Sequence, residues 1–413
     1  MCVCVCVCVS MFVFSLMVLS HHTVFIQVCG GPYGVESAVG AAGPLVTMVT
    51  LLILPLFWSL PMGLMSAELA CAMPSDGGFI IWVERAFGPF VGFMNGTLRC
   101  FSEIVDNSAF PVLFVSYLKT VIPSTIEDSN LYSWLLAIGV VVFCAVLNLY
   151  GVEAVGQAGL ILSALVLLPF VIMVGMGLPK ITPHTWTETP KSISWSLFLS
   201  DILWVTSGWD DAGCVAGSVY NPRKTYPRAV AFDVVLVSFT YLLPIAVGVC
   251  VDDWRQWDDG SFSEVAPKIG GHWLGVWVAV AAGIGCVGTF NSLLCTSSFA
   301  VQCMARMRYL PSFLAYEHPK YETPTAAVLC NAVIIAGISY FPFDAIIDVG
   351  FFLYAISLLL EWGALLFLRY REPNMPRPFK IGLSNTWLVV YMAIPMGLCV
   401  FVMCVASWLT YAI

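Results

Sequence analysis

Charged residues are scarce in this chain. Aspartate, glutamate, lysine and arginine make up 10% of its 413 residues, whereas soluble domains carry about 25%. Hydrophobic residues make up 60%, and the mean hydropathy is +0.90. The low charge excludes a soluble globular domain with an ordinary polar surface.

The sequence also lacks the motifs of an enzyme or a metalloprotein. We find no nucleophile, metal-ligand or nucleotide-binding motif, and most of the 16 cysteines stand singly in apolar runs. There they act as small hydrophobes rather than as a disulfide or zinc framework. We therefore predict no catalytic residue, no metal, no cofactor and no nucleic-acid partner.

Apolar runs of roughly 20 residues recur along the chain, and each is long enough to cross about 30 Å of hydrocarbon. They predict an all-α polytopic membrane protein with about 11 transmembrane helices. The predicted spans are 11–30, 44–73, 88–118, 130–150, 154–178, 196–217, 229–251, 272–300, 324–341, 344–368 and 386–411.

Lysine and arginine are unevenly placed between these spans. With the amino terminus inside, eleven fall in cytoplasmic loops and five in outer loops, as the positive-inside rule requires. The inner set is Arg85, Arg223, Lys224, Arg228, Arg306, Arg308, Lys320, Arg369, Arg371, Arg377 and Lys380. The outer set is Lys119, Lys180, Lys191, Arg255 and Lys268, among loops rich in Asp and Glu. Such loops either attract cations toward an outer mouth or are ordinary solvated loops.

Residues 1–10 form a low-complexity start in which Cys and Val alternate. A TG dinucleotide repeat read in frame encodes this string, so we expect a misassigned start or missing preceding sequence. Residues 11–413 form a single transporter domain. Its first repeat is placed at about 11–178, its second at about 196–368, and an extra span at about 386–411.

Two spans are interrupted by residues that break a helix. The first break is CGGPYGVE at 29–36, and the second is VTSGWDDAGCVAG at 205–217. They open two blocks of five spans each, and corresponding interruptions in two halves point to an inverted-repeat transporter with its site at the breaks. The alternative is that the glycines only allow close helix packing, which leaves Glu36 and the paired Asp210 and Asp211 unexplained.

Acidic residues inside membrane spans are costly and are functional candidates by default. Glu103, Asp106 and Asn107 share one helix face, and Arg99 four residues earlier could engage Glu103 in a structural ion pair, which favours Asp106 as the site residue. Glu68 is expected to be a gate or cap, and Asp201 to face an outer vestibule. Asp348 and Glu361 lie on a later helix, and nothing in the sequence links them to the breaks.

The segments GGPYGVESAVGAAGP, DGGFIIWVERAFGPFVGF, SEIVDNSAFPVLFVSYL, SGWDDAGCVAGSVYNPRKTYPRA and LPSFLAYEHPKYETPT resemble the amino acid–polyamine–organocation transporter superfamily. The similarity is greatest to the polyamine/proton symporters of plants and trypanosomatids and runs from about Gly30 to Trp408. It implies a LeuT-like five-plus-five inverted repeat with spans 1 and 6 interrupted, proton coupling and organic cation substrates.

Several features depart from that family. Span 5 has Gln157 and no lysine, and span 8 reads GTFNSLLC where the plant members carry acids. The given sequence stops at Ile413, before the twelfth span usual in the family, and shows no arginine-rich tail ahead of span 1. His21 and His22 are weaker candidates for a proton relay. These departures affect which polyamine is carried and how a proton is coupled.

We predict a polyamine importer of the putrescine and spermidine class, in the plasma membrane, driven by protons and working by alternating access. Carboxylates and aromatic faces would replace the hydration of its ammonium groups. The substrate site is predicted at Gly30, Gly31, Tyr33, Glu36, Asp106, Asn107, Ser207, Gly208, Trp209, Asp210 and Asp211. The proton-coupling candidates are Glu36, Glu103, Asp106 and Asp210.

The main alternative is an amino acid carrier of the same fold, most plausibly for cationic amino acids. Such a carrier needs N–H donors for a carboxylate at the first break, where Pro32 removes one donor and Glu36 adds negative charge. A sensor or inactive carrier without net flux is a further alternative.

Overall fold

The computed structural model describes residues 28–75, 77–121, 130–211, 222–341 and 343–405, and in these parts the regular structure is helical. The first predicted span, 11–30, lies almost entirely outside the described residues. The expected half-helix after Asp211 lies outside them as well.

Helices overlap every predicted span after the first, although the helix in the span predicted at 196–217 ends at Val205. They are α2 (Glu36–Phe57), α3 (Ser59–Ala72), α5 (Pro89–Val121), α7 (Asn130–Leu149), α8 (Val152–Gly177), α9 (Trp195–Val205), α10 (Pro222–Gly248), α12 (His272–Arg306), α13 (Thr325–Ile338), α14 (Phe343–Arg371) and α15 (Asn385–Val405). Short 3-10 turns occur at Leu178–Lys180, Thr185–Thr187, Trp254–Gln256 and Ser312–Ala315.

Two ten-residue helices fall between the predicted spans. They are α4 (Gly78–Phe87), which leads into α5, and α11 (Ser261–Gly270), which leads into α12. Glycine stands at both ends of each, at Gly77 and Gly88 and at Gly260 and Gly271, and all four have positive φ. Only glycine adopts such backbone conformations without strain, so these residues fix where each short helix begins and ends.

Helix α2 contains a kink at the point where the second predicted span, 44–73, begins. Gly43 has φ 81° and ψ 166°, and Pro44 follows it. Pro44 has no N–H to donate, and Thr47 Oγ1 instead donates to the Gly43 carbonyl at 2.9 Å and to the Ala38 carbonyl at 3.2 Å. The eight residues 36–43 therefore continue from the first break, and residues 44–57 begin the second predicted span.

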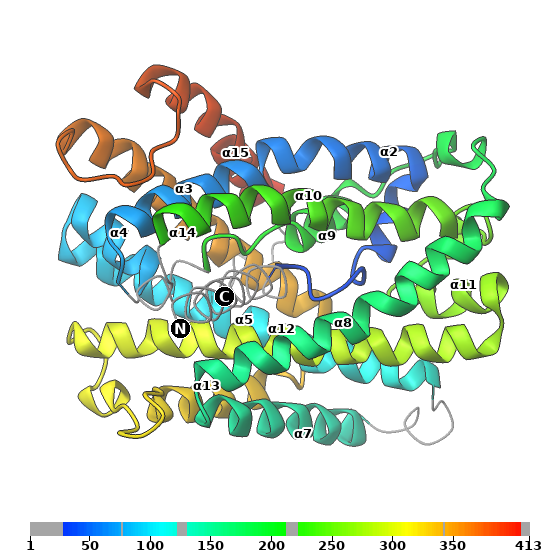
Figure 1. The fold of residues 1–413 in the computed structure, drawn as a ribbon, viewed down its shortest axis with the longest axis horizontal. Coiled ribbons are helices and arrows are strands. Elements are labelled where there is room, and N and C mark those ends of the chain that lie inside the picture. The colour runs from blue at the N-terminus through cyan, green and yellow to red at the C-terminus, as the bar shows by residue number, and fades with distance from the viewer. Residues whose placement is uncertain (1–27, 76, 122–129, 212–221, 342, 406–413) are drawn as a thin grey trace, which may run out of the picture.

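The helix α12 forms the centre of the bundle. It packs against α5, α8, α11, α7 and α13, and α5 packs in turn against α14 and α4. Figure 1 shows α12 and α5 running through the middle, with α7 and α13 on one side and α2, α3 and α10 on the other.

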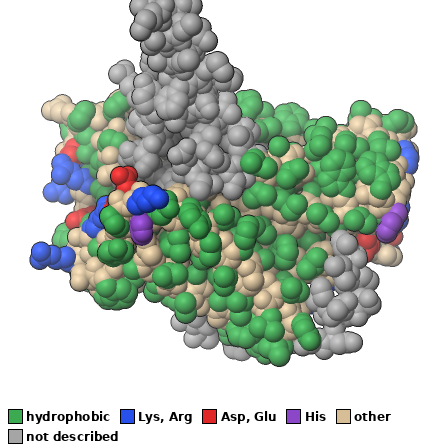
Figure 2. Space-filling view, turned by 60° about the horizontal axis from the view of Figure 1, so that its bottom comes forward, with side chains coloured by type: hydrophobic (Ala, Val, Ile, Leu, Met, Phe, Trp, Pro, Cys, Tyr) green, Lys and Arg blue, Asp and Glu red, His purple; other side chains and the backbone are tan. Residues whose placement is uncertain are grey.

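The outer surface of the bundle is apolar over its middle. Six helical segments of the described chain are long and apolar enough to cross a membrane, and only 22% of the most apolar window of α15 is buried. In Figure 2, hydrophobic side chains cover the centre of the visible face and charged side chains gather toward its two ends. Apolar residues that face outward in this way require lipid around them, so the fold is that of a multi-pass membrane protein.

Candidate functional site

A cavity lies where the two predicted breaks meet the long helices. It holds about 750 Å³ of empty space when the open solvent at its mouth is counted. Its walls come from residues 28–33, α5, α9 with the segment that follows it, α10, α12 and α14. Segments far apart in sequence therefore converge on one volume.

The first break brings Tyr33 to the cavity. Gly30, Gly31 and Gly34 all have positive φ, so the chain between Cys29 and α2 is not helical. A Cβ on Gly30 would lie 1.9 Å from Thr289 Oγ1, which shows how closely this segment packs against α12. The Tyr33 hydroxyl lies 3.2 Å from the same Thr289 oxygen. Tyr33 and Thr289 line the cavity, whereas Gly30 and Gly31 lie behind its wall.

The second break brings Ser207, Gly208 and Asp211 to the cavity. Helix α9 ends at Val205, and Gly208 then adopts φ 87°. The exposed backbone is satisfied by side chains from other helices: the Gly208 N–H donates to the Tyr354 hydroxyl at 3.1 Å. Ser59 Oγ donates to the Thr206 carbonyl at 2.9 Å. These bonds allow an unwound segment to exist inside the membrane.

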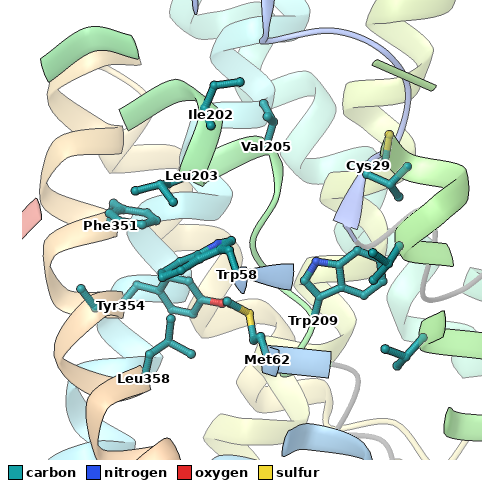
Figure 3. Close-up of a cluster of buried hydrophobic side chains, with 14 of the residues drawn as sticks. Cys29, Trp58, Met62, Ile202, Leu203, Val205, Trp209, Phe351, Tyr354 and Leu358 are labelled. Carbon is teal, nitrogen blue, oxygen red and sulfur yellow. The ribbon is translucent and has the colours of Figure 1, made fainter. Parts of the chain in front are cut away.

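Trp209 does not line the cavity. Its ring is 1% exposed and packs in the apolar core, and its indole N–H donates to the Thr206 carbonyl at 2.9 Å. Figure 3 shows this ring standing apart from Tyr354, whose hydroxyl is directed toward Met62. The described conformation therefore gives Trp209 a packing role beside the site.

Arg99 is the charged centre of the site, and its main partners lie on the second break. Its Nη2 donates to Asp210 Oδ2 at 2.7 Å and also to Asp211 Oδ1. The guanidinium carbon lies 4.1 Å from the centre of the Tyr354 ring, a cation–π distance. Arg99 is 2% exposed, and a buried cation requires several such partners.

Glu103 lies within ion-pair distance of Arg99, as the sequence suggested, but the arginine does not hydrogen-bond to it. Arg99 Nε stands 3.5 Å from Glu103 Oε1, and neither Glu103 oxygen accepts a hydrogen bond from a described residue. Asp106 instead accepts a 2.7 Å bond from Trp204 Nε1. Glu103 and Asp106 both line the cavity, and the ion pair that the sequence suggested between Arg99 and Glu103 is present.

Asn107 lines the cavity and points its amide toward α12, where Nδ2 donates to Ser297 Oγ at 3.2 Å. Asp210 lies just behind the wall and also accepts a 2.6 Å bond from the Tyr354 hydroxyl. Glu36 is fully buried away from the cavity, where Oε2 accepts from the Val35 N–H at 3.1 Å. Of the predicted site residues, Tyr33, Asp106, Asn107, Ser207, Gly208 and Asp211 are thus brought together on one cavity wall.

Two further acids have structural partners. Glu68 is fully buried in a pair with Arg369, while Arg377 Nε lies 3.4 Å from it and the Ile381 N–H donates at 2.8 Å. It therefore ties α3 to the end of α14. Asp201 accepts a 2.7 Å bond from Ser37, which joins α9 to α2. The side chain of Asp348 lies outside the described part of the chain.

Sequence reasoning missed several cavity residues on the later helices. Tyr241, Thr289, Thr296 and Tyr354 line the site, but isolated tyrosines and threonines in apolar spans carry no pattern that marks them. Arg99 did carry a signal, since a lone arginine inside a span needs a buried partner. What the sequence could not supply was the identity of that partner.

The cavity is acidic in balance. Glu103, Asp106 and Asp211 line it and Asp210 adjoins it, whereas Arg99 is the one cation among the lining residues. The side chains therefore offer an excess of anions, together with aromatic rings from Tyr33, Phe110, Trp204, Phe351 and Tyr354. Such a site suits a small organic cation with methylene groups.

Comparison with known proteins agrees with this picture. The family model described as amino acid permease matches residues 4–412. A probable polyamine transporter of Arabidopsis thaliana is 37% identical over 391 residues, covering 93% of this chain and 80% of the relative. Polyamine transporter PUT1 of Oryza sativa subsp. japonica is 35% identical over 387 residues, covering 93% and 72%.

A more distant relative has a different printed substrate class. Asc-type amino acid transporter 1 of Mus musculus is 26% identical over 341 residues, which is 77% of this chain and 62% of the relative. All of these relatives are transporters by name, and the described helices carry the apolar surface that a membrane requires. The chain belongs to the amino acid permease family and is a multi-pass membrane transporter rather than an enzyme.

Proposed function

We propose that the protein is a secondary active transporter that imports polyamines of the putrescine and spermidine class across the plasma membrane. It does so by alternating access, with a proton moving together with the substrate. The plant relatives named polyamine transporters support this choice, since they match more than nine-tenths of the chain.

The observation that carries the proposal is the excess of carboxylates around the cavity. Asp210 and Asp211 are engaged by Arg99, which leaves Glu103 and Asp106 as the lining acids without a guanidinium hydrogen bond. A diamine loses hydration at each ammonium group on entering, and each group needs an anion or an aromatic face in exchange. The two acids on α5 and the surrounding rings provide both.

The backbone of the first break disfavours a substrate carboxylate. The N–H of Gly31 donates to the Cys29 carbonyl, and the N–H of Tyr33 donates to the Gly31 carbonyl at 3.0 Å. The N–H of Val35 donates to Glu36, and Pro32 has none. The donors that an amino acid carrier would turn toward a carboxylate are therefore largely used within the segment itself.

We propose that the architecture is a LeuT-like five-plus-five inverted repeat. Adding 183 to a residue number carries the glycines that bound α4, Gly77 and Gly88, onto those that bound α11, Gly260 and Gly271. The backbone angles agree as well: φ 93° and ψ 171° at Gly88 match φ 93° and ψ 172° at Gly271. The same shift carries Pro44 and Pro61 onto Pro227 and Pro244.

The second candidate function is transport of cationic amino acids. It is favoured by Arg99, whose guanidinium lines the cavity and would bind a carboxylate if it left the aspartates. It is also supported by the mouse relative named as an amino acid transporter. The polyamine proposal is preferred because Arg99 already holds two carboxylates of its own chain.

Uptake of labelled putrescine and spermidine by cells that lack their own polyamine uptake tests the proposal. We expect saturable uptake that unlabelled polyamines compete away and that excess arginine, lysine or leucine leaves unchanged. Uptake of labelled arginine or lysine without uptake of polyamines would instead establish the second candidate. Purified protein in liposomes separates flux from binding without transport.

A further inference from the structure

A line of polar side chains continues from the cavity along the contact between α5 and α14. On α14, Tyr354, Ser357 and Glu361 are spaced by three and four residues, so they share one face. On α5, Asn95 stands four residues before Arg99 and contacts Ser357. The face of α14 that carries Glu361 thus also carries Tyr354, which donates to Asp210 on the second break, a relation that the sequence did not show.

Glu361 at the end of this line is fully buried. Its Oε1 lies 3.0 Å from Ser357 Oγ, and its Oε2 has no hydrogen-bond partner among the described residues. No ion pair joins it to any lysine, arginine or histidine in that part of the chain. A buried ionised carboxylate without a cation is strongly disfavoured.

The hydrogen bonds around Ser357 indicate where a proton lies. Asn95 Nδ2 lies 3.4 Å from the Phe79 carbonyl, which can only accept, so the amide nitrogen faces Phe79 and the amide oxygen faces Ser357. Ser357 Oγ has one hydroxyl hydrogen and faces two oxygen acceptors, Asn95 Oδ1 at 2.9 Å and Glu361 Oε1 at 3.0 Å. One hydrogen cannot fully serve both acceptors, and a protonated Glu361 that donates to Ser357 Oγ would satisfy both contacts.

The charged groups around Glu361 are already engaged with one another. Arg99 on α5 is held by Asp210 and Asp211 on the second break, and these are the charges that act on Glu361. Among the described residues, the other helices packed on α14 offer no free cation: α15 has no charged residue within Asn385–Val405, and α9 carries only Asp201. On α3, Glu68 is paired with Arg369 and Arg377. On α4, Arg85 is paired with Glu372, and Glu84 is the other charged residue.

We propose that Glu361 is protonated in this conformation and holds the proton that moves with the substrate. The proposal rests on the proton-coupled polyamine transport proposed above. Burying Glu361 in this conformation requires the neutral acid, because no cation in the described part of the chain is free to pair with its carboxylate. When the side with the arginine-rich loops, which is predicted to face the cytoplasm, opens to water, the O–H bond of Glu361 breaks. The proton passes to water, and a hydrated carboxylate remains.

Transport by the purified protein in liposomes tests the coupling. A gradient of about one pH unit can drive accumulation of about tenfold for each coupled proton, since 1.36 kcal/mol corresponds to a factor of ten. We expect wild-type protein to accumulate labelled spermidine under an inward proton gradient. Glu361→Gln, whose amide can still donate to Ser357, should retain exchange of internal for external spermidine and lose accumulation.

Asp233→Asn is the matched control. Asp233 is 1% exposed, one of its oxygens lacks a hydrogen-bond partner in the described chain, and it does not line the cavity. This variant should keep the accumulation driven by the gradient. Undiminished accumulation by Glu361→Gln would overturn the proposal, as would an equal loss in both variants.

Infrared spectra that compare wild type with each variant, in the absence of substrate, test whether Glu361 is protonated. The wild-type spectrum should contain a carbonyl-stretch band of a protonated carboxylic acid that is absent from Glu361→Gln and still present in Asp233→Asn. Its absence from the wild type would overturn the proposal even if polyamines are transported. If wild-type liposomes move polyamines without any response to a proton gradient, the role of Glu361 fails while polyamine transport stands.

Discussion

Asp106 tests whether a single negative charge in the cavity binds the substrate. In Asp106→Asn the amide oxygen can still accept from Trp204 Nε1, which now lies 2.7 Å from Asp106 Oδ1, so the fold should be retained. The lost interaction is a hydrogen bond to a charged group, worth about 1.5–3 kcal/mol. Polyamine affinity should therefore fall by about tenfold to 100-fold, as measured by initial uptake rates over a range of concentrations.

Trp204→Phe is the complementary variant for Asp106. It removes the indole N–H and leaves the carboxylate, so it should weaken polyamine binding far less than Asp106→Asn does. Surface labelling should show equal amounts of both variants in the membrane. Equal affinity of wild type and Asp106→Asn would contradict a charge-based role for this residue.

Arg99 should be essential for stability rather than only for transport. Arg99→Gln leaves Asp210 and Asp211 buried without their cation, and breaking a buried ion pair costs about 3–5 kcal/mol. The melting temperature of the detergent-purified protein should fall markedly. Adding Asp211→Asn to Arg99→Gln removes one of the two stranded charges and should restore part of the loss; an additive further loss would show that the pair is not coupled.

Local sequence predicted which residues are unusual, but not which of them meet. Gly208, Asp210 and Asp211 were identified because glycines and acids are rare within an apolar run. Arg99 lies 111 positions from Asp210, so their pairing depends on how α5 packs beside the second break. Helical spacing predicted Glu103, four residues away, as the partner of Arg99. It could not predict the partners that are distant in sequence, Asp210 and Asp211, which form the shorter bonds.

Helices long enough to cross a membrane were predicted well because length and apolarity are local properties. Helix α7 at Asn130–Leu149 and α15 at Asn385–Val405 fall within a few residues of their predicted spans up to the last described residues. The short helices α4 and α11 were missed because ten residues are too few to form an apolar span. The kink at Gly43 adjoins residue 44, where the second span was predicted to begin.

The glycines that end α4 and α11 allow a test of the proposed repeat. Gly88 and Gly271 share a backbone conformation open essentially only to glycine, and a non-glycine residue there costs about 1–3 kcal/mol. A Cβ at Gly88 would meet no atom within 4 Å, and at Gly271 the closest contact would be 3.7 Å. Gly88→Ala and Gly271→Ala should thus lower the melting temperature by similar amounts, through backbone strain alone.

Gly337→Ala is the control for these two variants. Gly337 lies in α13, and an added Cβ would meet nothing within 4 Å. Alanine suits a helix better than glycine does, so this change should leave the melting temperature unchanged or raise it slightly. A large loss at Gly88 with none at Gly271 would contradict equivalent roles in two repeats.

Charge is arranged over the whole molecule as its membrane function requires. The cavity gathers acids in the interior, the belt of the visible face is apolar, and charged side chains occupy its ends. Neither feature can be read from any one helix, because both arise only when the helices are assembled. The excess of lysine and arginine in alternate loops further predicts which end faces the cytoplasm.

That orientation can be tested with cysteines introduced at opposite ends of the molecule. Gln256 and Ser312 are both exposed, and the predicted topology places Gln256 outside and Ser312 in the cytoplasm. The parent should carry Cys250→Ala, because Cys250 is partly exposed near the outer end. In intact cells a membrane-impermeant maleimide should label Gln256→Cys and leave Ser312→Cys unlabelled until the membrane is permeabilised. The positive-inside rule predicts this asymmetry because arginine-rich loops are retained on the cytoplasmic side, and labelling of Ser312→Cys alone would reverse the direction of transport proposed here.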